Sequence, residues 1–173
     1  MRIGLVSDTH GLLDPGLDEV FAGCEAIVHA GDVVRSAVLA GLARIAPVTA
    51  VRGNNDDGPA FAHLPETALL PVGALTLLVV HDLGARERPA PPARRIIARR
   101  RPEIVIHGHS HRPGAAVLGR TLFVNPGSAG PRRFSLPRTA AVLTASGRKV
   151  EVAFFEMSGP RPAPFGDPVE AAL

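Results

Sequence analysis

Three histidines stand within five positions near the middle of the chain, in the stretch IVIHGHSHRP from Ile104 to Pro113. His107, His109 and His111 alternate at the end of a run of strand-forming residues. Residues that skip one position point the same way from an extended segment, so their ring nitrogens can reach one place. Imidazole nitrogens serve as metal ligands and as acids or bases near neutral pH. The stretch therefore predicts a chemical site at the end of a strand.

Similar donors follow four other apolar runs of the chain. Taken singly, Asp8 is better interpreted as a loop carboxylate or a helix cap, and a lone histidine as a satisfied polar residue. Taken together, five predicted strand ends bring seven oxygen or nitrogen donors to one face, which is too many for one ion. The seven candidate ligands are Asp8, His10, Asp32, Asn54, His81, His109 and His111.

The mixture of carboxylate, imidazole and amide donors also indicates which metals fit. It suits Mn²⁺, Fe, Zn²⁺ or Ni²⁺ better than Ca²⁺ or a structural zinc held by thiolates. We expect two divalent ions, with Mn²⁺ favoured and Ni²⁺, Zn²⁺ or Fe as alternatives.

The elements that must position these donors alternate in the first third of the chain. Apolar runs at 2–7, 25–30 and 46–53 predict strands, and helical spacing lies between them. The first helix is expected over 14–23 with Asp14 as its cap, and the second over 36–46 with Ser36 as its cap. Strands joined by helices form a parallel sheet, whose ligand sites gather at the carboxyl ends of the strands.

The rest of the chain predicts a second set of closely spaced strands. We expect two mixed sheets packed face to face with helices outside, forming one domain over residues 1–157. The stretch 158–173 is rich in proline and polar residues and is expected to form a loose tail. The further strands are expected at 66–72, 74–80, 103–108, 139–147 and 148–157, and within 115–127 on both sides of a hairpin turn at 118–120, with a helix over 93–103.

Composition narrows the classes of protein. The 173 residues suit one domain, and no apolar run reaches the about 18 residues of a membrane span. The N-terminus lacks the pattern of a secretory signal and Cys24 stands alone, so we expect a cytoplasmic protein and no membrane partner. The arginine-rich run at 93–103 is interpreted mainly as the solvated face of an amphipathic helix, with steering of anionic substrates as the alternative.

The donors lie in blocks that resemble a known family. In order, SDTHG, AGDVV, RGNND, VHD and HGHSHRP are similar to the five blocks of the calcineurin-like metallophosphoesterases, over about Ile3 to Phe155. The short length, with NPGS at Asn125–Ser128 and PRR after it, most resembles the compact bacterial and archaeal phosphodiesterase branch. The resemblance implies a four-layer α/β/β/α sandwich of the α/β class. It also implies a two-metal site in which Asp8, His10 and His111 hold one ion, Asn54, His81 and His109 hold the other, and Asp32 bridges them.

The same resemblance implies an activity. We expect a metal-dependent phosphoesterase, with a phosphodiesterase favoured and a small phosphate ester as substrate. Attack comes from a hydroxide shared by the two ions, and Asp32, Asn54 and His81 form the catalytic set. The alternative is a non-catalytic, metal-binding interaction scaffold, as in the retromer subunit of the same fold, although the intact ligand set speaks against it. A nuclease ranks lowest, because a chain without Trp or Tyr lacks a stacking platform for nucleic acid.

Two positions depart from the family pattern. Many members have a histidine where this chain has Asn55, and an amide cannot deliver a proton near neutral pH. The general acid is therefore unassigned. Asp82 stands where a glycine is usual, and its carboxylate either caps the following loop or lies near the second ion. His107 and His29 are interpreted as structural residues or supports of the ligands, and His63 belongs to no motif.

The NPGS block has two interpretations. Pro126 and Gly127 favour a turn between two strands. The alternative places Asn125, Ser128 and the nearby Arg132 at the border of the substrate pocket, where arginine suits bidentate contact with phosphate. We expect Asn55, Ser128 and Arg132 to be the substrate-binding residues. The oligomeric state is open; a homo-oligomer rests on analogy with compact family members.

Overall fold

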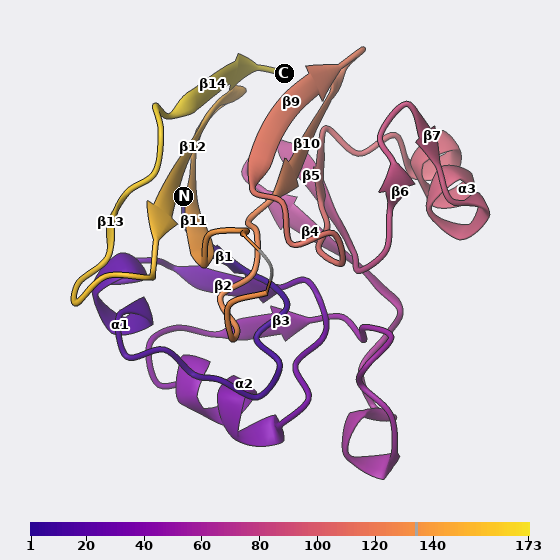
Figure 1. Ribbon diagram of the computed structural model, residues 1–173. Helices are drawn as coiled ribbons and strands as arrows, with labels where there is room; N and C mark the ends of the chain where they lie inside the picture. The colour runs from indigo at the N-terminus through magenta and orange to yellow at the C-terminus, as the bar shows by residue number, and fades with distance from the viewer. Residues whose placement is uncertain (134) are drawn as a thin grey trace.

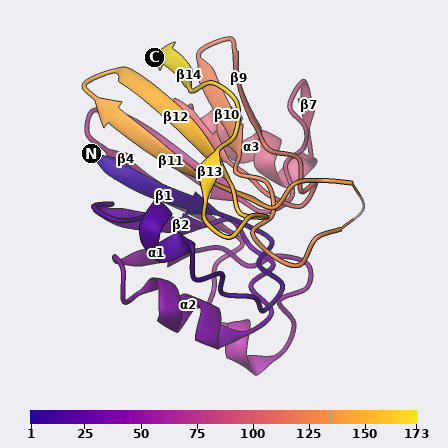
Figure 2. The ribbon, with the colours of Figure 1, turned by 60° about the vertical axis from the view of Figure 1, so that its left-hand side comes forward.

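The computed structural model describes residues 1–133 and 135–173, which form two β-sheets with helices outside (Figures 1 and 2). The first sheet has seven strands in the order β13-β12-β11-β1-β2-β3, with β14 also paired to β12, and the second has five in the order β4-β5-β8-β10-β9. The elements are β1 (Arg2–Val6), α1 (Leu17–Val20), β2 (Ala26–His29), α2 (Ser36–Leu42), β3 (Val48–Ala50), η1 (Pro59–Phe61), β4 (Thr67–Val72), β5 (Leu75–Val80), β6 (Gly84–Ala85), β7 (Arg88–Pro89), α3 (Pro91–Arg100), β8 (Ile104–Ile106), β9 (Gly114–Leu118), β10 (Thr121–Asn125), β11 (Thr139–Ser146), β12 (Lys149–Glu156), β13 (Ala163–Pro164) and β14 (Val169–Ala172).

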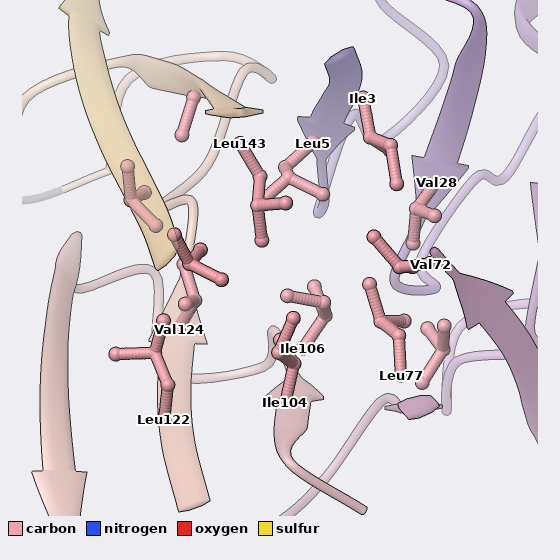
Figure 3. Close-up of a cluster of buried hydrophobic side chains, with 14 of the residues drawn as sticks. Ile3, Leu5, Val28, Val72, Leu77, Ile104, Ile106, Leu122, Val124 and Leu143 are labelled. Atoms are coloured by element: carbon pink, nitrogen blue, oxygen red, sulfur yellow. The ribbon is translucent and has the colours of Figure 1, made fainter. Parts of the chain in front are cut away.

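The main core lies between the two sheets (Figure 3). In β1, Ile3 and Leu5 face this core and are almost fully buried. In β8, Ile104 and Ile106 face it from the other sheet. Alternate residues of a strand point to opposite faces, so the intervening residues are free to contact the helices. Burial on both faces explains why these strands are continuous apolar runs in the sequence.

Two outer clusters attach the helices. Leu17 of α1 and Val38 of α2 pack with Val6 and Ile27 on the outer face of the first sheet. Ala93 of α3 packs with strand residues on the outer face of the second sheet. The order of layers is therefore helix, sheet, sheet, helix, which confirms the predicted α/β/β/α sandwich.

The parallel strands place their carboxyl ends at one edge. β1 pairs in parallel with β2, and β2 with β3, while β5 pairs in parallel with β8 in the other sheet. Loops that follow these five strands therefore meet at the same edge of the sandwich.

The helices differ in detail from the sequence-based expectation. α1 covers only Leu17–Val20, and Asp14 accepts a hydrogen bond from the Gly16 amide (2.8 Å) instead of capping the helix. Arg35 occupies the N-cap position of α2, so the prediction of Ser36 as cap is wrong. The short hairpin of β6 and β7, which sequence periodicity did not reveal, precedes α3.

The expectation of a loose tail is also wrong. β13 and β14 both pair with β12, and Val169, Ala171 and Leu173 pack against the main core. These alternating apolar residues lie on one face of β14, and the outer edge of β12 offers backbone groups that need partners. The proline-rich stretch thus covers the edge of the first sheet. Within the described residues, no helix has both the length and the hydrophobicity needed to cross a membrane.

Candidate metal centre

The loops after β1, β2, β3, β5 and β8 bring the seven candidate ligands together. Asp8 and His10 follow β1, Asp32 follows β2, and Asn54 lies beyond β3. The second sheet contributes the others: His81 directly follows β5, and His109 and His111 lie beyond β8. Contacts between donors from opposite sheets join them into one cluster at the edge where the five strands end.

The first group of donors contains Asp8, His10 and His111. The Asp8 Oδ1 atom lies 3.2 Å from the Nε2 atom of His111, and the Nε2 atoms of His10 and His111 are 3.4 Å apart. Within this group one ligand atom from each residue lies within 4.8 Å of the others.

The second group contains Asn54, His81 and His109. The Oδ1 atom of Asn54 lies 3.0 Å from the Nε2 atom of His81 and 2.9 Å from the Nδ1 atom of His109. The two histidine rings meet edge to face, with centroids 5.2 Å apart.

The carboxylate of Asp32 lies between the two groups. Its Oδ1 atom is 3.4 Å from Nε2 of His81, and its Oδ2 atom is 3.8 Å from Nε2 of His10. Each oxygen of one buried carboxylate therefore faces a different donor group. This is the arrangement that a bridging ligand requires.

The chemistry of the facing atoms fits cations. The Nδ1–H of His81 is directed at the Ala30 carbonyl (2.7 Å), which leaves a lone pair on Nε2, facing the oxygens of Asn54 and Asp32. Asp8 Oδ1 is buried and has no hydrogen-bond partner among the described residues. Such acceptors repel one another unless a proton or cation lies between them. Ligand atoms about 2.0–2.2 Å from one ion lie about 3 Å apart where their bonds meet at right angles, close to the distances found here.

The backbone of the ligand loops adopts an unfavourable conformation. Asp8, His10, Asp32, His109 and His111 have positive φ, at 53°, 45°, 57°, 67° and 57°. A left-handed conformation is uncommon outside glycine and costs of order 1–3 kcal/mol per residue. Only two other non-glycine residues of the described chain share it. The surrounding structure must therefore hold these loops in place.

Neighbouring side chains hold Asp8 from several directions. Ser7 Oγ and the His109 amide donate to Asp8 Oδ2, at 2.7 and 3.0 Å. Ser128 Oγ donates to the Asp8 carbonyl at 2.8 Å. Gly108 lies against the same carboxylate, since a Cβ added to it would be 2.6 Å from Asp8 Oδ2. One oxygen of Asp8 is thus occupied and the other is directed at His111.

His29 supports the loop that carries Asp8 and His10. Its Nδ1 accepts from the Gly31 amide at 3.2 Å, which places the ring proton on Nε2, 3.0 Å from the Thr9 hydroxyl. Complete burial lowers the pKa of His29 to about 4, so the ring is neutral at pH 7. The interpretation of His29 as a supporting residue agrees with these contacts.

Electrostatic surroundings also shift the pKa values of ligands. For Asp32, burial raises the pKa, but in the metal-free protein the contact with His81, when that ring carries both protons, and the hydrogen bond from the Asn55 amide outweigh burial and hold the pKa well below its usual range. For His81, burial lowers the pKa, and the contact with Asp32 and the charge of Asp8 overcome this effect and raise it. For His10, burial and then the charge of Arg133 lower the pKa. An ionised carboxylate at the centre of the site suits cation binding.

Other predicted residues occupy different places. The Asn55 amide nitrogen Nδ2 donates to Asp32 Oδ2 at 2.6 Å. Asp82 is exposed, accepts from the Gly84 amide as a loop cap (2.9 Å) and lies 4.0 Å from His109. His107 lies outside both donor groups, and burial lowers its pKa to about 4. The roles of Ser128 and Arg132 toward substrate stay predictions.

Sequence reasoning missed several supporting residues. Buried Asp56 accepts from the Val34 and Gly53 amides, at 2.7 and 2.8 Å, and so ties together the loops of Asp32 and Asn54. Arg133, next to the predicted Arg132, is the arginine whose charge reaches His10. Asp56 stands inside the block RGNND, which is the only sequence signal for it.

Comparisons with known proteins agree with this geometry. The profile of the calcineurin-like phosphoesterase superfamily domain matches residues 1–148. A curated protein of Methanothermobacter thermautotrophicus, named as a probable metallophosphoesterase, is 27% identical over 165 residues, covering 92% of this chain and 95% of the relative.

Two solved structures have the same fold. Vps29 of Entamoeba histolytica complexed with Zn²⁺ superposes with a TM-score of 0.79 at 19% identity, covering 98% of this chain and 99% of that one. The phosphoesterase YfcE of E. coli superposes with a TM-score of 0.68 at 21% identity, covering 99% of each chain. Because the profile match spans all seven donors, from Asp8 to His111, the chain belongs to the calcineurin-like phosphoesterase superfamily.

Proposed function

We propose that this protein hydrolyses phosphate esters with two divalent ions, and that phosphodiesters are its preferred substrates. The observation that carries the proposal is the position of Asp32, whose two oxygens face two separate donor groups. When bound, the ions supply an activated water nucleophile near neutral pH and offset charge that develops on the phosphoryl oxygens.

The ligand assignment follows the two groups. Asp8, His10 and His111 hold one ion, and Asn54, His81 and His109 hold the other. Asp32, whose oxygens face both groups, would be a ligand shared by the two ions. Mixed nitrogen and oxygen ligands favour Mn²⁺, with Zn²⁺, Ni²⁺ or Fe as alternatives, and the zinc complex of the similar Vps29 structure supports testing Zn²⁺ as well.

Residues around the ligands orient them. Ser7 and the His109 amide bind one oxygen of Asp8, so the other is directed toward the first ion. The Asn55 backbone amide donates to Asp32 Oδ1 and its side-chain amide donates to Oδ2, and these two hydrogen bonds hold the carboxylate between the groups. The Ser128 hydroxyl donates its hydrogen bond to the Asp8 carbonyl, which favours a structural role for the NPGS turn.

Leaving-group chemistry limits the substrates. Asn55 stands where a proton donor is common in the family, and an amide cannot supply a proton near pH 7. Esters with acidic leaving groups, which depart without protonation, should therefore react faster than esters of simple alcohols.

The test is a rate measurement on metal-stripped protein. Initial rates on bis(p-nitrophenyl) phosphate and p-nitrophenyl phosphate are measured while Mn²⁺, Ni²⁺, Zn²⁺ or Mg²⁺ is added. We expect turnover that depends on metal and favours the diester. Equal rates on both esters would contradict the diester preference, and turnover that persists in excess chelator would contradict metal dependence.

A second candidate is an interaction scaffold of the same fold. The structural likeness to Vps29 favours it, while the complete set of seven donors favours catalysis. The same titration separates the two functions. Binding of two ions without turnover of either ester would favour the scaffold.

A further inference from the structure

A cavity of about 300 Å³ lies beside the loop that carries His109 and His111. One wall is the β6–β7 hairpin, with Arg86 and Glu87, and the other is the segment of His107, Ser110 and Arg112, with Asn125 of β10. Nothing in the proposed metal chemistry uses these side chains.

The histidine loop separates this cavity from the metal centre. Gly108 packs against Ser7 and Asp8, so that side of the loop belongs to the ligands. Ser110 stands between the two ligand histidines and lines the cavity. Asn125 donates to the Gly108 carbonyl at 2.9 Å and to Ser110 Oγ at 3.0 Å, which fixes the loop between the two spaces. Residues 108–112 therefore contribute both two ligands of the metal centre and part of the cavity wall.

Several donors around the cavity are unused. Arg86 and Arg112 are exposed, and neither forms an ion pair within the described part of the chain. The charge of Arg86 lies near enough to His107 to contribute to its lowered pKa. The Ser110 hydroxyl accepts from Asn125 and from the Arg112 amide (3.5 Å) and donates to none of the described residues.

His107 is the most informative wall residue. Its side chain is part of a residue only 9% exposed, and it lines the cavity. Nδ1 lies 3.4 Å from the Asn125 amide nitrogen, while Nε2 has no hydrogen-bond partner in the described residues. Asp8 Oδ1 is the only fully buried side-chain polar atom without a partner in the described residues, so His107 Nε2 is open to the cavity and can pair with a ligand there.

We propose that this cavity binds a second phosphate group of the substrate, carried by the leaving alcohol. Two guanidinium groups, a free hydroxyl and an unpaired imidazole nitrogen match the acceptor oxygens of a phosphate. The inference rests on the proposed function and narrows it to esters whose leaving group is itself phosphorylated. Glu87 lines the same cavity, and its negative charge would repel a phosphate. Removing that charge should therefore strengthen phosphate binding, whereas removing an arginine should weaken it.

The test compares bisphosphates with a monophosphate. Bisphosphates of ethane-, propane- and butanediol, and propyl phosphate, are measured on the Mn²⁺-loaded protein by calorimetry and as inhibitors of bis(p-nitrophenyl) phosphate hydrolysis. We expect at least one bisphosphate to bind about tenfold tighter than propyl phosphate, the effect of one charge-assisted hydrogen bond.

Variants assign that preference to the cavity. Arg86→Gln and Arg112→Gln should each remove most of it while leaving propyl phosphate binding within about twofold. Glu87→Gln should increase it. Arg120→Gln changes another exposed arginine, on the turn between β9 and β10, and should leave the preference unchanged.

Two outcomes would overturn the inference: equal binding of all four compounds to the unchanged protein, or variants that weaken the monophosphate and the bisphosphates alike. Calorimetry keeps this result separate from the proposed function. If the protein showed no turnover but still bound a bisphosphate more tightly, and Arg86→Gln removed that preference, the proposed phosphoesterase function would be contradicted and the phosphate site in the cavity would be supported. An active enzyme without the preference would contradict the cavity alone.

Discussion

The hairpin turns and the metal centre of this molecule both contain left-handed backbone, but they differ in the residues that carry it. At the hairpin turns it falls on Gly73, Gly119 and Gly147, with φ of 60°, 63° and 60°, and nothing lies within 4 Å of an added Cβ there. At the metal centre it falls on aspartate and histidine as well as on Gly11 and Gly31. Glycine adopts this conformation without strain, whereas the site residues retain side chains that oppose it. The difference indicates that the ligand loops retain metal-binding side chains at positions where glycine would make the protein more stable.

The largest expected effect distinguishes Gly108, which packs against the ligand Asp8, from a hairpin glycine with open space around it. In Gly108→Ala the new methyl group would lie 1.9 Å from Ser7 Oγ and 2.6 Å from Asp8 Oδ2, so the ligand carboxylate must move. We expect diesterase activity to fall by about 100-fold or more, because a misplacement of about 1 Å is enough for such a loss. The control Gly119→Ala should cost about 1 kcal/mol of unfolding free energy and leave kcat unchanged. Equal activity in the two variants would show that the crowding at Gly108 has no catalytic consequence.

A smaller effect concerns the histidine that supports the strained loop. The pKa of His29 is lowered to about 4 in the folded protein, so the unfolded chain takes up a proton first as pH falls below 6.5. Stability from the neutral ring is complete above about pH 6.5 and decreases toward pH 4. We expect the metal-free protein to lose about 2 kcal/mol from this residue between pH 7 and 5, measured by urea unfolding.

Two variants make this pH dependence specific. His29→Asn should reduce it and leave the part due to His107, whose pKa is also lowered to about 4, and His63→Gln, at an exposed position, should leave it unchanged. If the two variants gave the same profile as the unchanged protein, the buried ring would not be the source.

The smallest expected effect measures the strain directly. His10 has φ of 45°, and both His10→Gly and His10→Ala remove its imidazole. Glycine also removes the backbone penalty, so the glycine variant should be more stable than the alanine variant by about 1 kcal/mol. Thermal unfolding of the two metal-free proteins compares them. Both should bind metal more weakly than the unchanged protein, and an alanine variant as stable as the glycine variant would argue against strain at this position.

Local patterns explain why much of the fold and site was predictable. Ile3 and Leu5 alternate within a strand, and Asp8 and His10 follow it directly, so periodicity and strand ends locate both the core and the donors. Family resemblance then supplied the sharing of the donors between two ions, which remains a proposal.

Long-range contacts explain the rest. Ser7, Thr9 and Asp56 support the ligands through partners distant in sequence, and the blocks SDTHG and RGNND that contain them do not show which atoms they contact. The pairing of β14 with β12 likewise depends on a free sheet edge that forms only in the folded chain, while composition alone indicated a loose tail. The β6–β7 hairpin is too short for periodicity to reveal.

The central claim is that Asp32 is shared by two metal ions, and its most direct test is Mn²⁺ binding to the Asp32→Ala variant. Binding is measured by calorimetry and electron paramagnetic resonance, and the diesterase rate is measured on the same protein. The unchanged protein should bind two Mn²⁺ that show magnetic coupling, because we propose Asp32 as a ligand shared by both ions. Asp32→Ala should lose the coupled signal and nearly all turnover, whereas Asp57→Ala, an exposed carboxylate nearby, should keep both. A variant lacking Asp32 that retained a coupled pair and a near-normal rate would contradict the central claim.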